Sequence, residues 1–419
     1  MASTPKIKVL WWSEIFASTG FATVAHALLK KLQATGKYDI TVVGVLYYGE
    51  PHPPGFEGIT VLPAVTPALS YLPGYDDKLG RARLLDLLKS DHFDIFFSLT
   101  DMQNTYTIGQ EVLTIRSKLT KKFKWISYTP VDWTPSKDWV ENGFGLSDYP
   151  VLYTHYAQDA VKKVSSKVTR IIPHGVDTTV FHPLSVEDNL KFKQEMFGYE
   201  HIDDFVVTNV NRNQPRKDIP RTIAAFSLFH KDHSASLLYL HMGASETGGN
   251  MVEVAKHFGL KLGKDVFFPG GFKWDIGYPI EVLNQIYNVS DVVVTTTLGE
   301  GWGMSLTEAM ATKTPVVAPN NTSITEILDN GKRGFLIPIS ETDWLFHDPT
   351  GVARICPTVS VEAVKEEIND VWAFGKGKEM DMYTDPAYDW VQTITWDKVG
   401  DQWVSLFDEA MRKSVIIKP

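Results

Sequence analysis

An α/β protein with two parallel-sheet domains is the fold class that this sequence predicts, and three observations predict it. Short apolar strands alternate with amphipathic helices in the first half of the chain, and the same alternation restarts after a charged, weakly periodic stretch. The 419 residues are also too many for one ordinary hydrophobic core. Apolar residues make up 43% and charged residues 22% of the chain, which is typical of folded globular proteins.

The first domain opens with a strand, a helix and a second strand. Residues 6–12 form an apolar run typical of a buried strand, and the helix that follows places Val24 and Leu28 on one face before Gly36 ends it. Further strands are expected within residues 38–48, 94–101 and 124–132. Strands that alternate with helices form parallel sheets, and such sheets bind ligands beyond the carboxyl ends of their strands.

The second domain repeats this pattern and is followed by a closing helix. Its strands are expected within residues 205–212, 236–243, 291–297 and 315–319. Apolar residues at helical spacing in residues 395–414 predict the closing helix. The expected organisation is a first domain at residues 1–185, a linker at 186–203, a second domain at 204–390 and, at 391–419, a C-terminal helix that returns to the first domain.

Two glutamates flank a helix start in the second domain. Glu300 lies in a glycine-rich turn after a strand, and Glu308 lies eight residues later in the helix. Glycines let backbone N–H groups approach a ligand, and a helix start favours an anion such as phosphate. The residues whose backbone is expected to approach the ligand are Gly301, Trp302, Gly303, Met304 and Ser305. The layout favours a nucleotide sugar, with its sugar at Glu300 and its ribose at Glu308. Two solvated glutamates in an ordinary strand–turn–helix unit are the alternative.

The loop after another strand of this domain carries two cations. Arg212 and Lys217 lie five residues apart, between a strand and a helix. Arginine can bind two phosphate oxygens at once and lysine supplies a point charge, so the pair can neutralise a diphosphate. A solvated basic loop is the alternative for this pair alone. Together with the two glutamates, however, the loop places phosphate-neutralising and hydroxyl-accepting groups at neighbouring strand ends.

These two motifs resemble the donor-binding signature of retaining glycosyltransferases with the GT-B fold, particularly glycosyltransferase family 4. The matching segments are "NVNRNQPRK" at residues 209–217 and "GEGWGMSLTEAMATKTPVVAP" at residues 299–319. "IIPHGVDTTVFHP" at residues 171–183 is similar to the family's segment at the end of the first domain. The resemblance implies two Rossmann-like domains that face a central cleft, the first binding the acceptor and the second the donor.

The resemblance also implies roles for single residues. Glu300 would hold the hydroxyls of the transferred sugar, as a catalytic residue, and Glu308 would hold the ribose. Arg212 and Lys217 would hold the diphosphate. The amides near Gly303 would support both the sugar and the phosphate.

The first domain departs from the family's pattern at two places. Members usually carry a glycine-rich turn after the first strand, where this chain offers Gly20 alone as an amide for the donor phosphate. Many members carry a histidine at the end of a later strand, where this chain has Asp132. Asp132 and Asp101 both follow predicted strands and could orient or deprotonate an acceptor hydroxyl, with helix capping as the alternative for each. His155 is a third candidate.

Composition and charge limit the cofactors, partners and compartment. The net charge of −9 disfavours extensive nonspecific binding to nucleic acid. The single Cys356, the lack of an apolar stretch of about 20 residues and an opening without a secretory signal predict a cytoplasmic protein. The sequence shows no cluster of histidines or cysteines, so it predicts neither a metal nor another cofactor. A basic amphipathic helix at residues 111–124 is expected to be a solvated surface, with weak contact to a membrane or a polyanion as the alternative. No stable protein partner is inferred.

The expected function is therefore transfer of a hexose from a nucleoside diphosphate sugar to an acceptor hydroxyl, with retention of configuration as the resemblance implies. A UDP-sugar is favoured over a GDP-sugar as donor. The acceptor stays open between a glycan, a lipid, a protein and a modified nucleobase. The alternatives are a nucleotide-sugar epimerase or a sugar phosphorylase on the same fold, and a nucleotide-sugar-binding module without catalysis.

Overall fold

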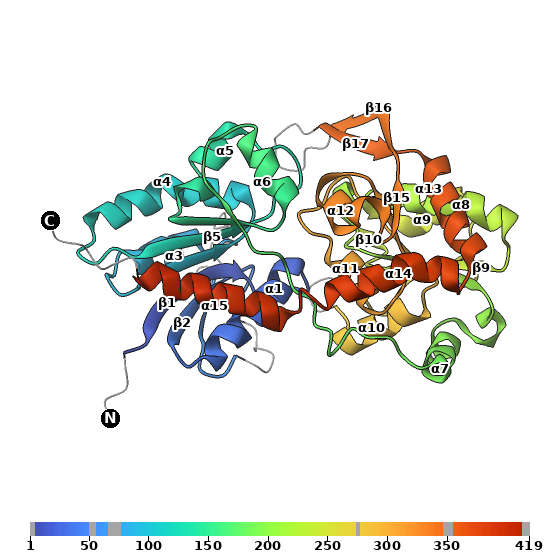
Figure 1. Cartoon of the computed structure of the whole chain (residues 1–419), viewed down its shortest axis with the longest axis horizontal. Helices are drawn as coiled ribbons and strands as arrows, with labels where there is room; N and C mark the ends of the chain where they lie inside the picture. Colours follow the sequence, from blue (N-terminus) through green and yellow to red (C-terminus); the bar gives the residue numbers. More distant parts are fainter. Residues whose placement is uncertain (1–4, 50–55, 66–76, 274–276, 347–354, 413–419) are drawn as a thin grey trace. The chain divides into compact units, whose positions relative to one another are not determined.

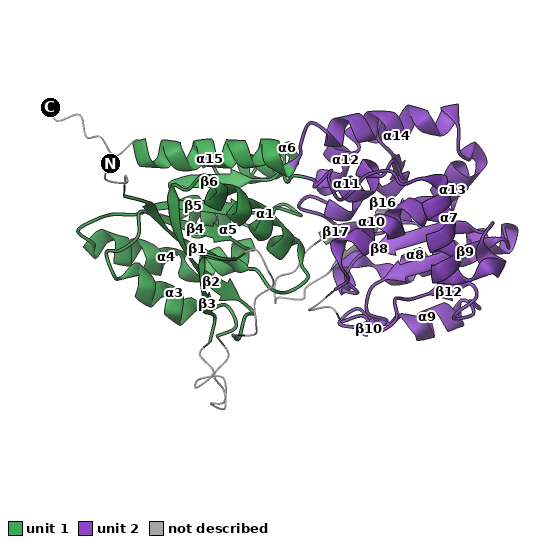
Figure 2. Ribbon diagram, turned by 90° about the horizontal axis from the view of Figure 1, so that it is seen from below, with its two compact units in different colours: residues 1–175, 396–419 green, residues 176–395 purple. Residues whose placement is uncertain are grey.

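The chain divides into two compact units, each an α/β fold with a parallel sheet (Figures 1 and 2). Unit 1 comprises residues 1–175 and 396–419, and unit 2 comprises residues 176–395. The computed structural model describes residues 5–49, 56–65, 77–273, 277–346 and 355–412. The two parallel-sheet units confirm the predicted fold class.

The sheet of unit 1 has the strand order β3-β2-β1-β4-β5-β6-β7 within the described residues, so its order reverses between β1 and β4. The strands are β1 (Ile7–Glu14), β2 (Tyr38–Val45), β3 (Thr60–Pro63), β4 (Ile95–Leu99), β5 (Lys124–Thr129), β6 (Tyr149–Leu152) and β7 (Arg170–Ile171). The helices are α1 (Gly20–Ala34), α3 (Arg81–Leu88), α4 (Met102–Lys118), α5 (Lys137–Glu141), α6 (His155–Lys162) and α15 (Trp396–Arg412), with a 3-10 turn η1 (Phe144–Leu146).

The C-terminal helix completes the core of unit 1. Helices α3 and α4 pack against one face of the sheet. On the other face, Trp403 and Phe407 of α15 pack against Phe97 of β4, with ring centroids 5.3 and 5.6 Å apart. The same helix lies against α1, where Lys31 pairs with Asp401 at 2.9 Å. The helix therefore returns to the first domain, as the sequence predicts.

The main sheet of unit 2 has the strand order β12-β9-β8-β13-β14-β15 within the described residues. These strands are β8 (Phe205–Val210), β9 (Ser236–His241), β12 (Val266–Phe267), β13 (Val292–Val294), β14 (Val316–Pro319) and β15 (Phe335–Ile337). Antiparallel pairs are formed by β10 (Ser245–Glu246) with β11 (Gly249–Asn250), and by β16 (Ile339–Phe346) with β17 (Ile355–Val359).

The helices of unit 2 flank this sheet. They are α7 (Val186–Phe197), α8 (Ile219–Asp232), α9 (Met251–His257), α10 (Ile280–Val289), α11 (Met304–Ala311), α12 (Thr322–Ile327), α13 (Val361–Phe374) and α14 (Lys378–Val391). The 3-10 turns are η2 (Tyr199–His201), η3 (Pro215–Lys217) and η4 (Asp329–Gly331).

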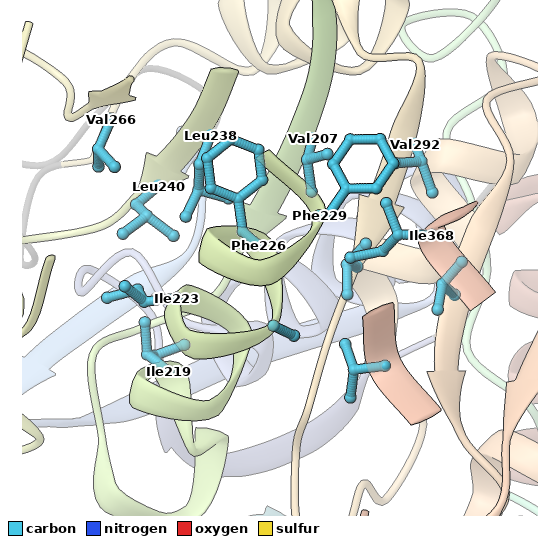
Figure 3. Packing of buried hydrophobic residues seen from close by; sticks show 14 of the residues in the cluster. Val207, Ile219, Ile223, Phe226, Phe229, Leu238, Leu240, Val266, Val292 and Ile368 are labelled. Atoms are coloured by element: carbon cyan, nitrogen blue, oxygen red, sulfur yellow. The ribbon is translucent and has the colours of Figure 1, made fainter. Parts of the chain in front are cut away.

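Packing of α8 fixes the loop that precedes it. Phe226 and Phe229 of α8 are fully buried beside Val207 of β8 and Leu238 of β9 (Figure 3). Full burial of a large apolar side chain contributes about 1.5–3 kcal/mol, so this helix is held firmly on the sheet. The connection at residues 211–218 is therefore anchored at both ends, by β8 and by α8.

The expected linker and domain boundaries differ from the structure. Residues 186–203 form α7 and η2 inside unit 2, because Phe197 packs against Tyr239 of the sheet, with ring centroids 5.8 Å apart. Unit 2 begins at Val176, earlier than predicted, and the closing helix begins at Trp396. Because many residues of α7 are charged, the sequence pattern does not indicate the apolar contact of Phe197 with the sheet.

The basic helix expected at residues 111–124 is also wrong in extent. Helix α4 ends at Lys118, and the chain then turns into β5. Arg116 pairs with Asp148 at 2.5 Å, so its charge is partly compensated. In the part of the chain that the structure describes, no helix has both the length and the apolar character needed to cross a bilayer.

Candidate functional site

The two predicted motifs of unit 2 meet where the strand order of its sheet reverses. Strands β8 and β13 are parallel neighbours, with β9 beyond one and β14 beyond the other. Open α/β sheets bind ligands at such a switch point, beyond the carboxyl ends of the strands. Residues 211–218 follow β8 and residues 295–303 follow β13. The fold therefore brings the basic loop and the glycine-rich turn together.

Backbone and hydroxyl groups join the loop to the turn. The Leu298 amide donates to the Arg216 carbonyl at 2.8 Å, and the Arg216 guanidinium donates to the Gly299 carbonyl. Beneath them the Thr296 hydroxyl donates to the Asp218 carbonyl at 2.8 Å. These bonds cross between segments about 80 residues apart in sequence, so the geometry of one segment depends on the other.

Glu300 is a buried carboxylate held by two cations. Its Oε1 lies 2.5 Å from Lys217 Nζ and 3.3 Å from Arg216 Nη1. Burial by itself would raise the pKa of Glu300, but Lys217, then Arg216 and hydrogen bonds, outweigh burial and lower the pKa to about 2. Glu300 is therefore ionised at neutral pH, as a fixed hydrogen-bond acceptor with adjacent positive charge.

The cations of the basic loop pair with two different carboxylates. Lys217 contacts Glu300, and Arg216, which sequence reasoning missed, joins it. Arg212 instead pairs through Nε with the buried Glu246 at 3.1 Å. Arg212 and Lys217 are thus held by different carboxylates. The one available signal for Arg216 was its place directly before Lys217 in the same loop.

Glu308 has a contrasting environment on α11. Its Oε2 accepts a hydrogen bond from the Tyr287 hydroxyl at 2.7 Å. Burial raises the pKa of Glu308 to about 7, and the Tyr287 hydrogen bond opposes this rise only in part. Glu308 therefore changes charge near neutral pH, unlike Glu300.

The glycine-rich turn leads directly into α11. Gly303 occupies the N-cap position with a φ of 100°, a conformation that glycine adopts without strain, and it offers no side chain to cap the helix. Met304 and Ser305 belong to the first turn of α11, where the backbone N–H groups point out of the N-terminal end of the helix. The buried Trp302 stacks on Trp390, with ring centroids 6.2 Å apart, which fixes the turn against α14.

The candidates of unit 1 lie beyond the carboxyl ends of its own strands. Asp101 follows β4 and Asp132 follows β5. Asp101 makes no capping hydrogen bond to α4, and Ser136 caps α5, so the capping alternative does not account for either carboxylate. Burial first, and then nearby groups that include both aspartates, raise the pKa of Tyr153, so both carboxylates lie near the end of β6.

Two further candidates of unit 1 stand at helix starts. Gly20 is the exposed first residue of α1, whose N-cap Thr19 accepts a hydrogen bond from the Ala22 amide at 3.3 Å. His155 is the first residue of α6, which Thr154 caps. The roles of both residues stay predictions.

Comparisons with known proteins agree with this arrangement. Residues 192–345 match the family described as glycosyl transferases group 1. The chain is 29% identical over 205 residues to the putative glycosyltransferase EpsD of Bacillus subtilis, an alignment that covers 45% of this chain and 48% of EpsD. The chain thus spans about half the length of this relative.

Solved structures extend the likeness in fold to the whole chain. Sucrose-phosphate synthase from Thermosynechococcus elongatus has a TM-score of 0.73 at 17% identity, covering 98% of this chain and all of the other. The Anabaena protein HepE, solved in complex with UDP-glucose, has a TM-score of 0.67 at 16% identity, covering 96% of this chain and all of HepE. The resemblance to GT-B glycosyltransferases is confirmed, for the family in unit 2 and for the fold across both units.

Proposed function

Since residues 192–345 match the glycosyl transferases group 1 family and the chain has the GT-B fold, we propose that this protein transfers a hexose from a nucleoside diphosphate sugar to an acceptor hydroxyl. One observation carries the proposal: an ionised Glu300 with Lys217 and Arg216 beside it, at the switch point of the sheet. Such a cluster offers acceptors for sugar hydroxyls and positive charge for a departing diphosphate.

The chemistry follows from these charges. When the bond between the sugar and the diphosphate breaks, negative charge grows on the diphosphate. Lys217, Arg216 and the amides at the start of α11 stabilise that charge, because groups already aimed at developing charge lower the barrier. Glu300 accepts hydrogen bonds from the sugar, and its negative charge stabilises the positive charge that develops on the sugar ring. Glu308 accepts the ribose hydroxyls.

The donor and the stereochemistry rest on resemblance. A UDP-sugar is favoured because HepE, which shares the fold, binds UDP-glucose. Retention of configuration is expected because the two motifs resemble those of retaining enzymes. In unit 1, Asp132 and Asp101 are the candidates that orient or deprotonate the acceptor hydroxyl. The scheme needs no metal, because the cations of the chain neutralise the diphosphate.

A donor assay tests the proposal. The protein is incubated with UDP-glucose or GDP-glucose, with and without a mixture of sugar, lipid and peptide acceptors, and released nucleoside diphosphate and new glycosides are measured. We expect diphosphate release that acceptors stimulate, an axial anomeric product by NMR, and no loss of rate on addition of a chelator.

Other outcomes would identify the alternatives. A changed UDP-sugar without release of UDP indicates an epimerase, and a sugar phosphate formed only with inorganic phosphate indicates a phosphorylase. Binding of UDP-glucose with no turnover under any of these conditions indicates a binding module and contradicts the proposal.

A further inference from the structure

Two hydroxyl side chains hold the backbone of Glu300 from both sides. The Glu300 amide donates to Thr322 Oγ1 at 3.0 Å, and the Ser323 hydroxyl donates to the Glu300 carbonyl at 2.7 Å. The same Ser323 hydroxyl lies 3.1 Å from the carbonyl of Trp302. Ser323 is fully buried. The N–H and the C=O of the residue that carries the key carboxylate are therefore both fixed by the start of α12.

Thr322 adopts a costly conformation to make its contact. Its φ is 48°, in the left-handed region, which is rare for a β-branched residue. Its hydroxyl is oriented by Asn321, whose Oδ1 lies 3.1 Å away. Strained backbone of this kind persists where the surrounding structure holds it, and it clusters at functional sites. Here the strained residue accepts a hydrogen bond from the backbone amide of Glu300, the residue whose carboxylate is proposed to bind the sugar.

The two hydroxyls are not explained by the needs of α12 itself. The N-cap residue Asn321 makes no side-chain capping bond to this helix. The Thr322 and Ser323 hydroxyls are directed to the turn after β13. A purely local role in starting the helix would direct them to the amides of α12.

We propose that Thr322 and Ser323 are positioning residues that aim the Glu300 carboxylate at the transferred sugar. Because the backbone N–H and C=O of Glu300 are both fixed, the position of its carboxylate depends on the side-chain torsions. Contacts with Lys217 and Arg216 restrict these torsions. The inference rests on the proposed function, because it assigns Glu300 to the sugar. It predicts that loss of either hydroxyl impairs the sugar-dependent step and spares binding of the nucleotide.

Variants at these positions test the inference. Thr322→Ala and Ser323→Ala remove one hydroxyl each, and Thr322→Ser keeps the hydroxyl. Thr325→Ala is the matched control, because the Thr325 hydroxyl lies on the same helix and donates to Asn320 instead, at 2.7 Å. The readouts are kcat for UDP release from UDP-glucose, the Kd for UDP by calorimetry, and the melting temperature.

The two alanine variants at the turn should lower kcat about 10- to 100-fold, since small misplacement of a reacting group has effects of this size. The Kd for UDP should stay within about twofold of the wild type, in line with a group that does not touch the nucleotide. Thr322→Ser should restore most of the rate, and Thr325→Ala should match the wild type. If Thr322→Ala does not fold, Ser323→Ala tests the same claim.

A double-mutant cycle separates positioning from general stability. In a Glu300→Gln background the alanine substitutions should have little further effect, because they act through Glu300. Equal losses in both backgrounds, or unchanged kcat in the single variants, would overturn the inference. If the wild type releases no UDP, the proposed function fails. The inference is then read from the ratio of the Kd values for UDP and UDP-glucose, and a ratio that Thr322→Ala and Ser323→Ala leave unchanged would overturn it.

Discussion

Glu300 and Glu308 are the same side chain, eight residues apart in one segment, and the fold gives them opposite charge behaviour. Glu300 lies against Lys217 and Arg216 and has a pKa of about 2. Glu308 lies against the Tyr287 hydroxyl and has a pKa of about 7. Burial raises the pKa of both carboxyls, so the nearby cations make the difference.

The contrast suits two different ligand groups. A permanently charged carboxylate is useful beside a ring on which charge changes during the reaction, because its effect is then larger in the transition state. A carboxyl that titrates near neutral pH can bind hydroxyls of a ribose that takes no part in bond breaking. We therefore expect substitutions at Glu300 to act on the rate and those at Glu308 to act on the affinity.

The largest expected effect is on turnover in Glu300→Gln. The amide keeps the size of the side chain but removes its charge, so kcat for UDP release from UDP-glucose should fall at least ~100-fold, the usual loss when one stabilising group of a transition state is removed. Steady-state kinetics measures the rate, with Glu253→Gln, at an exposed glutamate of α9, as a matched substitution. A kcat within a few-fold of the wild type would remove Glu300 from the catalytic role.

A smaller effect is expected for Lys217→Ala, which removes the nearer cation of Glu300. Loss of a charged hydrogen-bond partner in a buried site should lower the free energy of unfolding by about 1–3 kcal/mol at neutral pH and weaken UDP binding by about 1.5–3 kcal/mol. Denaturant unfolding and calorimetry measure the two quantities. Lys313→Ala, which breaks an exposed pair with Asp385, should cost less than about 1 kcal/mol.

The pH dependence gives this prediction a second test. The pKa of Glu300 is lowered in the folded state, so its pairing contributes stability above the unfolded pKa near 4.5, and this contribution is lost as the pH falls toward 2. The difference in stability between wild type and Lys217→Ala should therefore shrink in acid. A difference that is constant from pH 7 to pH 3 would mean that Lys217 acts through something other than Glu300.

The smallest expected effect is the pH dependence at Glu308. Ribose hydroxyls that donate to this carboxyl favour its charged form, so the affinity for UDP-glucose should rise about 3- to 10-fold between pH 6 and pH 8. Glu308→Gln should flatten this rise. Calorimetry across the pH range measures it, and UDP-glucose is chosen because its phosphates do not titrate there. The same rise in Glu308→Gln would assign the titration to another group.

Stability should change in the opposite sense at Glu308. The pKa of this carboxyl is raised in the folded state, so its ionisation destabilises the fold as the pH rises from about 4.5 through 7. Glu308→Gln should therefore match the stability of the wild type below about pH 4 and exceed it at about pH 8, as denaturant unfolding at the two pH values measures.

Local patterns predicted the fold and the location of the candidate site well. The apolar strand before each motif placed Glu300 and Lys217 at strand ends, and parallel-sheet topology then required them to share one edge. The same reasoning could not resolve which cation meets which carboxylate. Arg216 and Lys217 are neighbours in sequence, and the backbone conformation of η3 directs both side chains to Glu300. Arg212 pairs with Glu246 instead.

The rest of the site depends on contacts that sequence spacing does not encode. Thr322 and Ser323 reach Glu300 from a segment more than 20 residues away, through a left-handed backbone that no propensity favours for threonine. The sequence predicts a linker at residues 186–203 because this stretch is charged and weakly periodic, and Phe197 is the one residue of α7 that is buried. Expectations for Asp101, Asp132 and Gly20 stay predictions that await an acceptor and a donor.

Four dissociation constants test the division of labour between the two glutamates most directly. Glu300→Gln and Glu308→Gln are each titrated with UDP and with UDP-glucose by calorimetry at pH 8. Relative to the wild type, we expect Glu308→Gln to weaken the binding of both ligands by a similar factor, since both contain the ribose, and Glu300→Gln to leave the Kd for UDP unchanged. Equal effects of both substitutions on both ligands would contradict the account.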